Sequence, residues 1–132
     1  TSGQRKRLVK YVLCKLESDA SGVARDYEAD TGTIEHILPE NPGVEWDAYF
    51  DPQRQAEQVY RLGNLTLLEA SLNRQVGNQL LAAKRALYAQ SGYTLTRAVA
   101  GEADDAWSPA GLARRQAHMA RRAAHVWRSD FE

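Results

Sequence analysis

The sequence of 132 residues is poor in several features, and each shortage excludes a class of protein. A single cysteine, Cys14, cannot form a disulfide within the chain, so disulfide-stapled secreted scaffolds are excluded and a reducing compartment is favoured. No apolar run approaches the roughly 20 residues that span a bilayer, so we do not expect a membrane protein. The sequence also has no initiator methionine and no signal peptide, which favours an excised part of a longer chain.

Neither sign of charge is in excess, since 17 Lys and Arg residues stand against 17 Asp and Glu residues. A formal net charge of zero argues against a protein that coats DNA without specificity. The charges are nevertheless segregated, because eleven of the 17 acidic residues lie within residues 17–57 and most basic residues lie outside that range. Such segregation can produce one basic face, although a solvated helix surface is the commoner explanation.

The residues that are present fit a globular protein, with 43% apolar and 26% charged. The length suits a single domain over residues 1–132, because two separate cores would each be marginal. Apolar spacings of three and four predict a mostly helical chain, and two short apolar runs predict a small two-stranded element in its middle. We expect helices over residues 4–17, 53–61, 71–77, 79–90 and 109–127, and strands over residues 33–38 and 64–68.

Capping residues support three of these helices. Ser71 and Asn78 are predicted to cap the helices over 71–77 and 79–90. Ser108 is predicted to cap the last helix, with Pro109 at its first helical position. Residues 18–32 are expected to form a loop, and the acidic residues 40–51 an irregular segment.

Histidine is scarce, and only one of the three histidines has a neighbour that suggests chemistry. His118 and His125 lie in the arginine-rich last helix without a carboxylate or cysteine at ligand spacing, so a solvated helix face explains them. His36 follows Glu35 at the end of an apolar strand that Pro39 terminates. Adjacent strand residues point to opposite sides, so this pair serves one site only where the strand ends or bends. Alone, the pair is weak evidence, and a hydrogen-bonded surface histidine is the default explanation.

Two asparagines stand where that residue type is a poor choice. Asn64 lies between Gly63 and an apolar strand, and Asn73 follows nine residues later in a predicted helix. Asparagine competes with the backbone for hydrogen bonds in both helices and strands. The residues alone leave both a functional and a structural explanation open. In the structural explanation, Asn64 is a turn residue and Asn73 is a simple cap.

Three segments taken in order resemble the HNH, or ββα-metal, nuclease motif. They are residues 35–39 (EHILP), 63–68 (GNLTLL) and 72–78 (LNRQVGN). More narrowly, the first two segments are similar to the DUF1524 branch of that superfamily. Lys84 and Tyr88 on the next helix, and a last helix bracketed by Trp107 and Trp127, extend the resemblance over nearly the whole chain.

The DUF1524 branch forms the C-terminal nuclease half of DUF262–DUF1524 restriction and defence proteins, including GmrSD-like and SspE-like enzymes. The resemblance therefore implies a mainly α fold of the α+β class with an embedded ββα-metal motif. It implies a metal-dependent DNA endonuclease that nicks DNA in anti-phage defence, an N-terminal DUF262-like partner domain, no membrane association, and a bacterial cytoplasmic location.

The resemblance also assigns roles to the site residues. Glu35 and Asn73 are expected to bind one divalent metal ion, Mg²⁺ or Mn²⁺, because carboxylate and amide oxygens suit hard cations. His36 is expected to act as the general base on water. Asn64 is expected to orient His36 by hydrogen bonding to the loop after Pro39.

Further residues are expected to contact DNA phosphates. Arg74 and Lys84 are the candidates, although solvated helix residues are an equal explanation. Two departures from the pattern matter. Many relatives carry a structural zinc held by cysteine pairs, which a chain with one cysteine cannot hold, and many have Asp where Glu35 stands.

Two other functions stay open at this point. The chain could be a catalytically silent DNA-binding module with the same fold, or a structural domain that regulates its neighbour. The presence of both Glu35 and His36 speaks against a silent module, which has no need for that pair.

Overall fold

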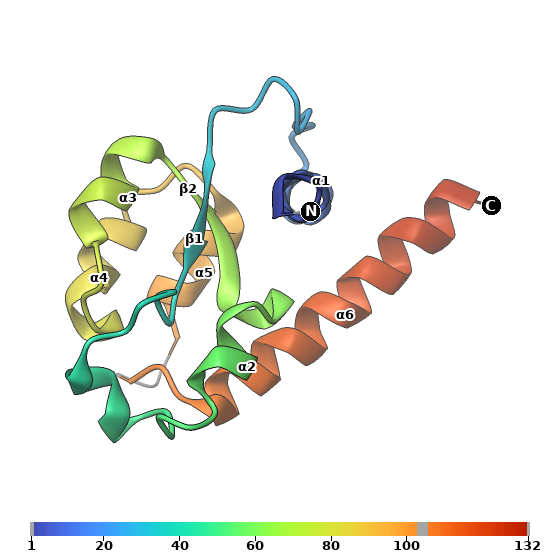
Figure 1. Ribbon diagram of the computed structural model, residues 1–132. Helices are drawn as coiled ribbons and strands as arrows, with labels where there is room; N and C mark the ends of the chain where they lie inside the picture. Colours follow the sequence, from blue (N-terminus) through green and yellow to red (C-terminus); the bar gives the residue numbers. More distant parts are fainter. Residues whose placement is uncertain (1, 103–105, 132) are drawn as a thin grey trace.

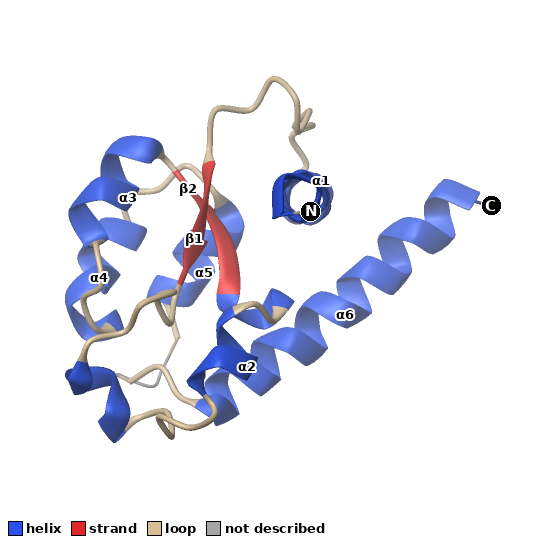
Figure 2. Cartoon of the chain, viewed as in Figure 1, coloured by secondary structure: helices blue, strands red, loops and turns tan. Residues whose placement is uncertain are grey.

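The computed structural model describes residues 2–102 and 106–131, which form six α-helices, two 3₁₀ helices and one small sheet (Figure 1). In chain order the elements are α1 (Ser2–Ser21), β1 (Thr33–His36), η1 (Val44–Ala48), α2 (Gln55–Val59), η2 (Leu62–Asn64), β2 (Leu65–Leu68), α3 (Ala70–Val76), α4 (Leu81–Tyr88), α5 (Thr94–Ala100) and α6 (Pro109–Phe131). The expectation of a mainly helical α+β chain with two strands is confirmed for the described residues (Figure 2).

The two strands pair antiparallel, with Glu35 opposite Thr66 and His36 opposite Leu65. All four residues of β2 are buried, whereas β1 is only partly covered. Two strands alone are not stable in water, so helices must cover them. Helix α1 lies on one side of the sheet, and α3 and α4 lie on the other (Figure 1). The partly covered strand β1 thereby lies between α1 and α3.

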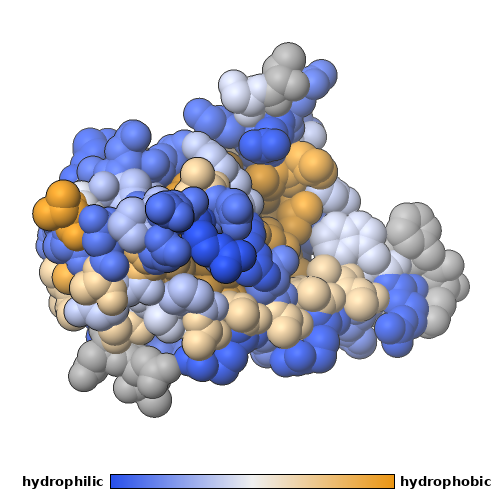
Figure 3. Space-filling view, turned by 60° about the horizontal axis from the view of Figure 1, so that its bottom comes forward, coloured by the Kyte–Doolittle hydropathy of each residue, from blue (hydrophilic) through white to orange (hydrophobic). Residues whose placement is uncertain are grey.

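Strand β2 separates two groups of buried side chains. Leu65 and Leu67 pack with α1, α5 and α6 in one group, and Leu68 packs in the other with side chains from the loop after β1 and from α3 and α4. This division follows from the alternation of side chains along a strand. The space-filling view shows a mostly hydrophilic face, with apolar side chains reaching the surface near its centre (Figure 3). No helix in the described ranges is long and apolar enough to cross a membrane.

Local sequence accounts for both long helices. In α1 the apolar spacing buries Leu13, Cys14 and Leu16. In α6 the Ser108 hydroxyl accepts a hydrogen bond from the Gly111 backbone N–H at 3.3 Å, with Pro109 at the first helical position. The predicted cap of the last helix is therefore confirmed.

The other two predicted caps were wrong. Helix α3 begins at Ala70 after Glu69, one residue before Ser71. Helix α4 begins at Leu81, and the Asn78 side chain instead donates to the Asn41 carbonyl at 3.1 Å. Asn78, which local spacing predicted to cap a helix, therefore makes a tertiary contact with the loop after β1 instead.

Helix α5 was not predicted. Its seven residues have no side-chain cap of their own, and the Glu17 carboxylate accepts hydrogen bonds from the backbone N–H groups of Thr94 at 2.8 Å and Leu95 at 2.9 Å. Glu17 is fully buried, and these bonds satisfy donors that a helix N-terminus otherwise leaves free. A residue of α1 therefore caps α5, which no local pattern can indicate.

Candidate active site

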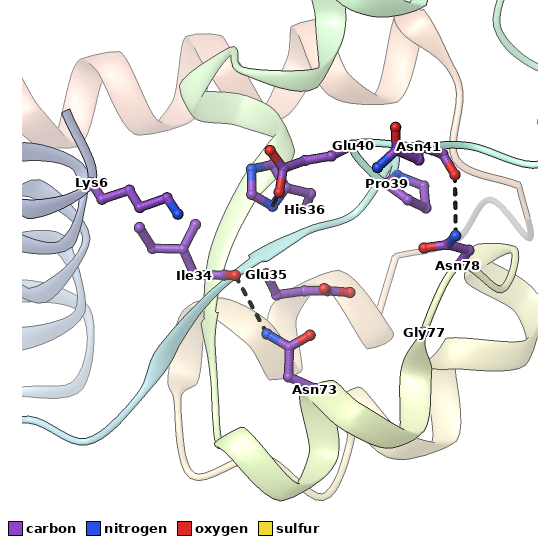
Figure 4. A pocket seen from close by; sticks show the side chains of 10 residues that line it. All are labelled: Lys6, Ile34, Glu35, His36, Pro39, Glu40, Asn41, Asn73, Gly77 and Asn78. Atoms are coloured by element: carbon purple, nitrogen blue, oxygen red, sulfur yellow. Dashed lines mark hydrogen bonds and ion pairs between the residues drawn. The ribbon is translucent and has the colours of Figure 1, made fainter. Parts of the chain in front are cut away.

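An open pocket of about 320 Å³ lies where β1 ends, between α1 and α3 (Figure 4). Strand β1 and the loop after it supply most of its lining, α3 and the turn after it supply the opposite wall, and α1 supplies one residue. The lining residues are Lys6, Ile34, Glu35, His36, Pro39, Glu40, Asn41, Asn73, Gly77 and Asn78. The structure thus brings Glu35, His36 and Asn73 to one pocket.

Glu35 is held from behind by two side chains of α4. Its Oε2 accepts hydrogen bonds from Lys84 Nζ at 2.9 Å and from the Tyr88 hydroxyl at 2.5 Å. Only 4% of Glu35 is exposed, and its Oε1 accepts no hydrogen bond from the part of the chain that the structure describes. Burial, together with the Glu35 charge, raises the pKa of Tyr88 well above its usual range, which keeps the hydroxyl a donor. One carboxylate oxygen is anchored and the other faces the pocket.

The Asn73 side chain is oriented by strand β1. Its amide nitrogen donates to Thr33 Oγ1 at 2.8 Å and to the Ile34 carbonyl at 3.4 Å. Because both partners accept hydrogen bonds, the side-chain nitrogen faces the strand, and the amide oxygen is turned toward Glu35 (Figure 4). The pocket therefore presents one carboxylate oxygen and one amide oxygen from different elements.

His36 lies on the opposite side of the strand end from the Glu35 anchor. Its Nδ1 is 3.9 Å from Glu40 Oε1, and its ring meets Tyr60 edge-on with centroids 5.8 Å apart. Burial lowers the pKa of His36, and the nearby carboxylates of Glu40 and Glu35 offset that effect only in part. The imidazole is thus favoured in its neutral form, which can accept a proton.

Asn64 does not line the pocket. It is fully buried, and its side chain bonds to Leu38 N at 2.8 Å, Leu38 O at 3.0 Å, Val59 O at 2.9 Å and Trp107 Nε1 at 2.9 Å. The prediction that Asn64 bonds to the loop after Pro39 was wrong, because its side chain bonds to Leu38, which precedes the proline. Asn64 joins the loop after β1 to α2 and to the segment that precedes α6.

The two phosphate candidates have different positions. Lys84 is fully buried and donates to Glu35 and to the carbonyls of His36 at 3.2 Å and Ile37 at 3.0 Å. This position corrects the expectation of a phosphate contact for Lys84, since every donor is directed into the protein. Arg74 is exposed on α3, beside Asn73.

Four residues of the site region were not identified from the sequence. Tyr88 was named as part of the family resemblance, without a role in the site. For Glu40, the i,i+4 spacing from His36 was the only local indication. Lys6 and Tyr60 lie far from β1 in the sequence, so nothing in their neighbourhood indicated them. His118 lies elsewhere, in a pocket between α5 and α6, and His125 is exposed on α6.

The donor set fits a hard divalent cation. The described residues contain no group of three or more His, Cys, Asp or Glu side chains able to hold a metal ion. A single carboxylate with one amide oxygen is nevertheless a ligand set that Mg²⁺ accepts, because this ion keeps several of its waters. The buried Lys84 charge on the same carboxylate weakens cation binding, and the open pocket leaves space for water ligands.

Comparison with known proteins agrees with the resemblance drawn from the residues. A family model described as "GmrSD restriction endonucleases, C-terminal domain" matches residues 1–122. Searches of curated proteins and of solved structures gave no match to this chain. Since the match includes both strands, α3 and the whole pocket lining, this chain belongs to the family of C-terminal domains of GmrSD restriction endonucleases.

Proposed function

We propose that this chain is a metal-dependent DNA endonuclease of the HNH type that nicks DNA as part of an anti-phage restriction system. The observation that carries the proposal is the meeting of Glu35, His36 and Asn73 in one open pocket, in a chain of a restriction endonuclease family. The proposal includes a DUF262-like N-terminal partner and a bacterial cytoplasmic location.

The order of elements supports an HNH assignment. Strands β1 and β2 pair antiparallel, α3 follows β2 after Glu69, and Asn73 on α3 bonds back to β1. The acid and the histidine stand together at the end of the first strand, and the asparagine comes from the helix. The resemblance to the ββα-metal motif implies such an arrangement, which supports the proposal.

The chain's residues divide the chemistry between two oxygens and one imidazole. Glu35 Oε1 and Asn73 Oδ1 would hold one Mg²⁺ or Mn²⁺, with Lys84 and Tyr88 keeping the carboxylate in place. A bound divalent cation neutralises charge on a phosphodiester and stabilises the leaving oxygen. The chain's only cysteine, Cys14, is buried in α1, so no structural zinc is included.

His36 would take the proton from the attacking water. The Glu40 carboxylate is nearest to Nδ1, which favours a proton on that nitrogen and leaves Nε2 as the acceptor. Asn64 contributes by holding Leu38, two residues after the base, and Arg74 is the retained candidate for a phosphate contact. One pocket with one base acts on one phosphodiester at a time, so nicking is expected.

Nicking of supercoiled plasmid tests the proposal directly. The chain should nick in Mg²⁺ or Mn²⁺ and stop when EDTA is added. His36→Ala should reduce the rate by about 10²–10⁴, the usual contribution of a general base. The control is His125→Ala, an exposed histidine on α6 that should leave the rate unchanged.

Two results would contradict the proposal. Nicking by His36→Ala at the wild-type rate would remove the assigned base. Binding of DNA without nicking in any divalent metal would favour a silent DNA-binding module instead.

A further inference from the structure

A second pocket adjoins the proposed active site on the other side of His36. It has a volume of about 240 Å³ and lies between α1, the end of β1 and Tyr60. Four residues line both pockets, namely Lys6, Ile34, His36 and Glu40. The two pockets are therefore neighbours with the His36 side chain in the lining of both, and together they are called the groove.

Basic side chains of α1 border this groove. Arg5 and Lys6 line the second pocket, and Lys6 also lines the first, with its side chain directed toward it (Figure 4). Lys6 and Arg7 also line an open hollow of about 540 Å³ beside the same helix. Three consecutive basic residues thus follow the groove from the proposed active site to the outer surface of α1.

These three cations are exposed on α1. Within the described residues, Arg5, Lys6 and Arg7 form no ion pair, whereas Lys10 one turn later is bound to Asp30 and to the Gly32 carbonyl. The Arg5 guanidinium lies over the Tyr60 ring, 5.8 Å from its centroid. In a chain with no net charge, a group of exposed basic residues therefore borders the pocket that contains Glu35 and His36, and none of them forms an ion pair with a described residue.

We infer that Arg5, Lys6 and Arg7 bind phosphates of the DNA strand that crosses His36, so that α1 is the DNA-positioning edge of the nuclease. Lys6 is placed for the phosphate nearest the pocket, and Arg5 and Arg7 for phosphates on either side. Tyr60 is 51% exposed and holds Arg5 at the groove, as expected for a cation over an aromatic face. The inference rests on the proposed function, since it takes DNA as the substrate of the adjacent pocket.

The site itself needs such an edge. The carboxylates of Glu35 and Glu40 face the groove and repel an approaching phosphate backbone. Cations that are fixed on a helix offset this repulsion and release counterions when they bind phosphate. Phosphate contacts set the register of a protein on DNA, which is what a single base at His36 requires.

DNA binding in the absence of metal tests this inference without cleavage. Fluorescence anisotropy with a labelled duplex, in EDTA and at several salt concentrations, gives the salt dependence of the binding constant. Arg5→Gln and Lys6→Gln should each reduce the slope of log K against log salt by about 0.9, the value for one lost phosphate contact on duplex DNA. If wild type and variant bind equally at 1 M salt, this change in slope makes the variant's binding roughly eightfold weaker at 0.1 M.

The matched control is Arg121→Gln, which removes the same charge from an exposed position on α6. It should leave the slope unchanged. An unchanged slope in both α1 variants, an equal effect of Arg121→Gln, or no DNA binding by the wild-type chain would each overturn the inference. Failure of the proposed function would be seen separately, as absence of plasmid nicking by the wild-type chain in Mg²⁺ or Mn²⁺.

Discussion

Lys84 and Glu35 form an ion pair of 2.9 Å in which the side chains are 0% and 5% exposed. The same ammonium donates to the carbonyls of His36 and Ile37, where β1 ends. Helix α4 therefore fixes both the proposed metal-binding carboxylate and the backbone that carries the proposed base. Desolvation lowers the pKa of Lys84, and the Glu35 charge opposes this effect only in part.

Lys84→Met should strongly destabilise the protein. The change leaves the Glu35 carboxylate buried without its counter-charge, which typically costs about 3–5 kcal/mol. Urea unfolding followed by circular dichroism measures the change in the free energy of unfolding. The double variant Lys84→Met/Glu35→Gln is the control, since it removes the charge and should recover part of the loss. Equal stability of wild type and Lys84→Met would contradict a buried ion pair.

Asn64→Ala should lower stability and nicking together. Its four buried hydrogen-bond partners lose their side-chain contact, and each unsatisfied buried group costs about 1–3 kcal/mol. At a temperature where the variant is still folded, kcat should fall while DNA affinity is retained, because Asn64 does not reach the pocket. A variant with a normal kcat would show that the Leu38 loop does not position His36.

Asn73→Ala should raise the Mg²⁺ concentration needed for half-maximal nicking by about tenfold or more, because loss of even an indirect contact commonly costs 10–100-fold in metal affinity. Asn73→Asp keeps an oxygen ligand but loses the amide donor to Thr33 and Ile34, so it should restore metal dependence only in part. Asn78→Ala is the matched control, since Asn78 also lines the pocket but bonds to Asn41. An equal shift in both alanine variants would indicate a general disturbance of the pocket.

Gly63→Ala should destabilise the contact between η2 and α6. An added Cβ would lie 2.7 Å from the Leu112 carbonyl oxygen and 2.8 Å from the Gln116 backbone nitrogen. Backbone atoms cannot yield as a side chain does, so we expect a loss of about 1–3 kcal/mol in thermal unfolding. Gly101→Ala, whose nearest contacts are at 3.7 Å, should change stability by less than about 0.5 kcal/mol.

Asp30 should contribute stability that is lost in acid. Burial alone would raise its pKa, but hydrogen bonds from Tyr93, Gly32 and Arg25 outweigh burial, and the pKa is lowered. The folded state then binds fewer protons than the unfolded state below about pH 4, so unfolding becomes easier as the pH falls through that window. Asp30→Asn should be less stable at neutral pH, and its free energy of unfolding should fall less steeply as the pH is lowered. An unchanged dependence of stability on pH would contradict this assignment.

Much of the architecture could be predicted from residues close in sequence. Apolar spacing identified α1, Ser108 and Pro109 marked the start of α6, and two short apolar runs identified the strands. These features depend on neighbours within one or two turns. The adjacency of Glu35 and His36, and the three ordered segments around them, were also sufficient to indicate the family.

Contacts between distant residues decided the rest. Helix α5 depends on a cap from Glu17, and Lys84 changed from an expected phosphate contact to a buried partner of Glu35, 49 residues earlier. The groove beside His36 likewise exists because α1 packs against β1, which brings Lys6 to the pocket. Periodicity and caps are local properties of a chain, whereas burial and the pairing of charges depend on which surfaces meet. The sequence by itself therefore determined the two long helices, the two strands and the residue types of the site. Only the tertiary structure decided that α5 forms, which charges face the pocket and which are buried behind it.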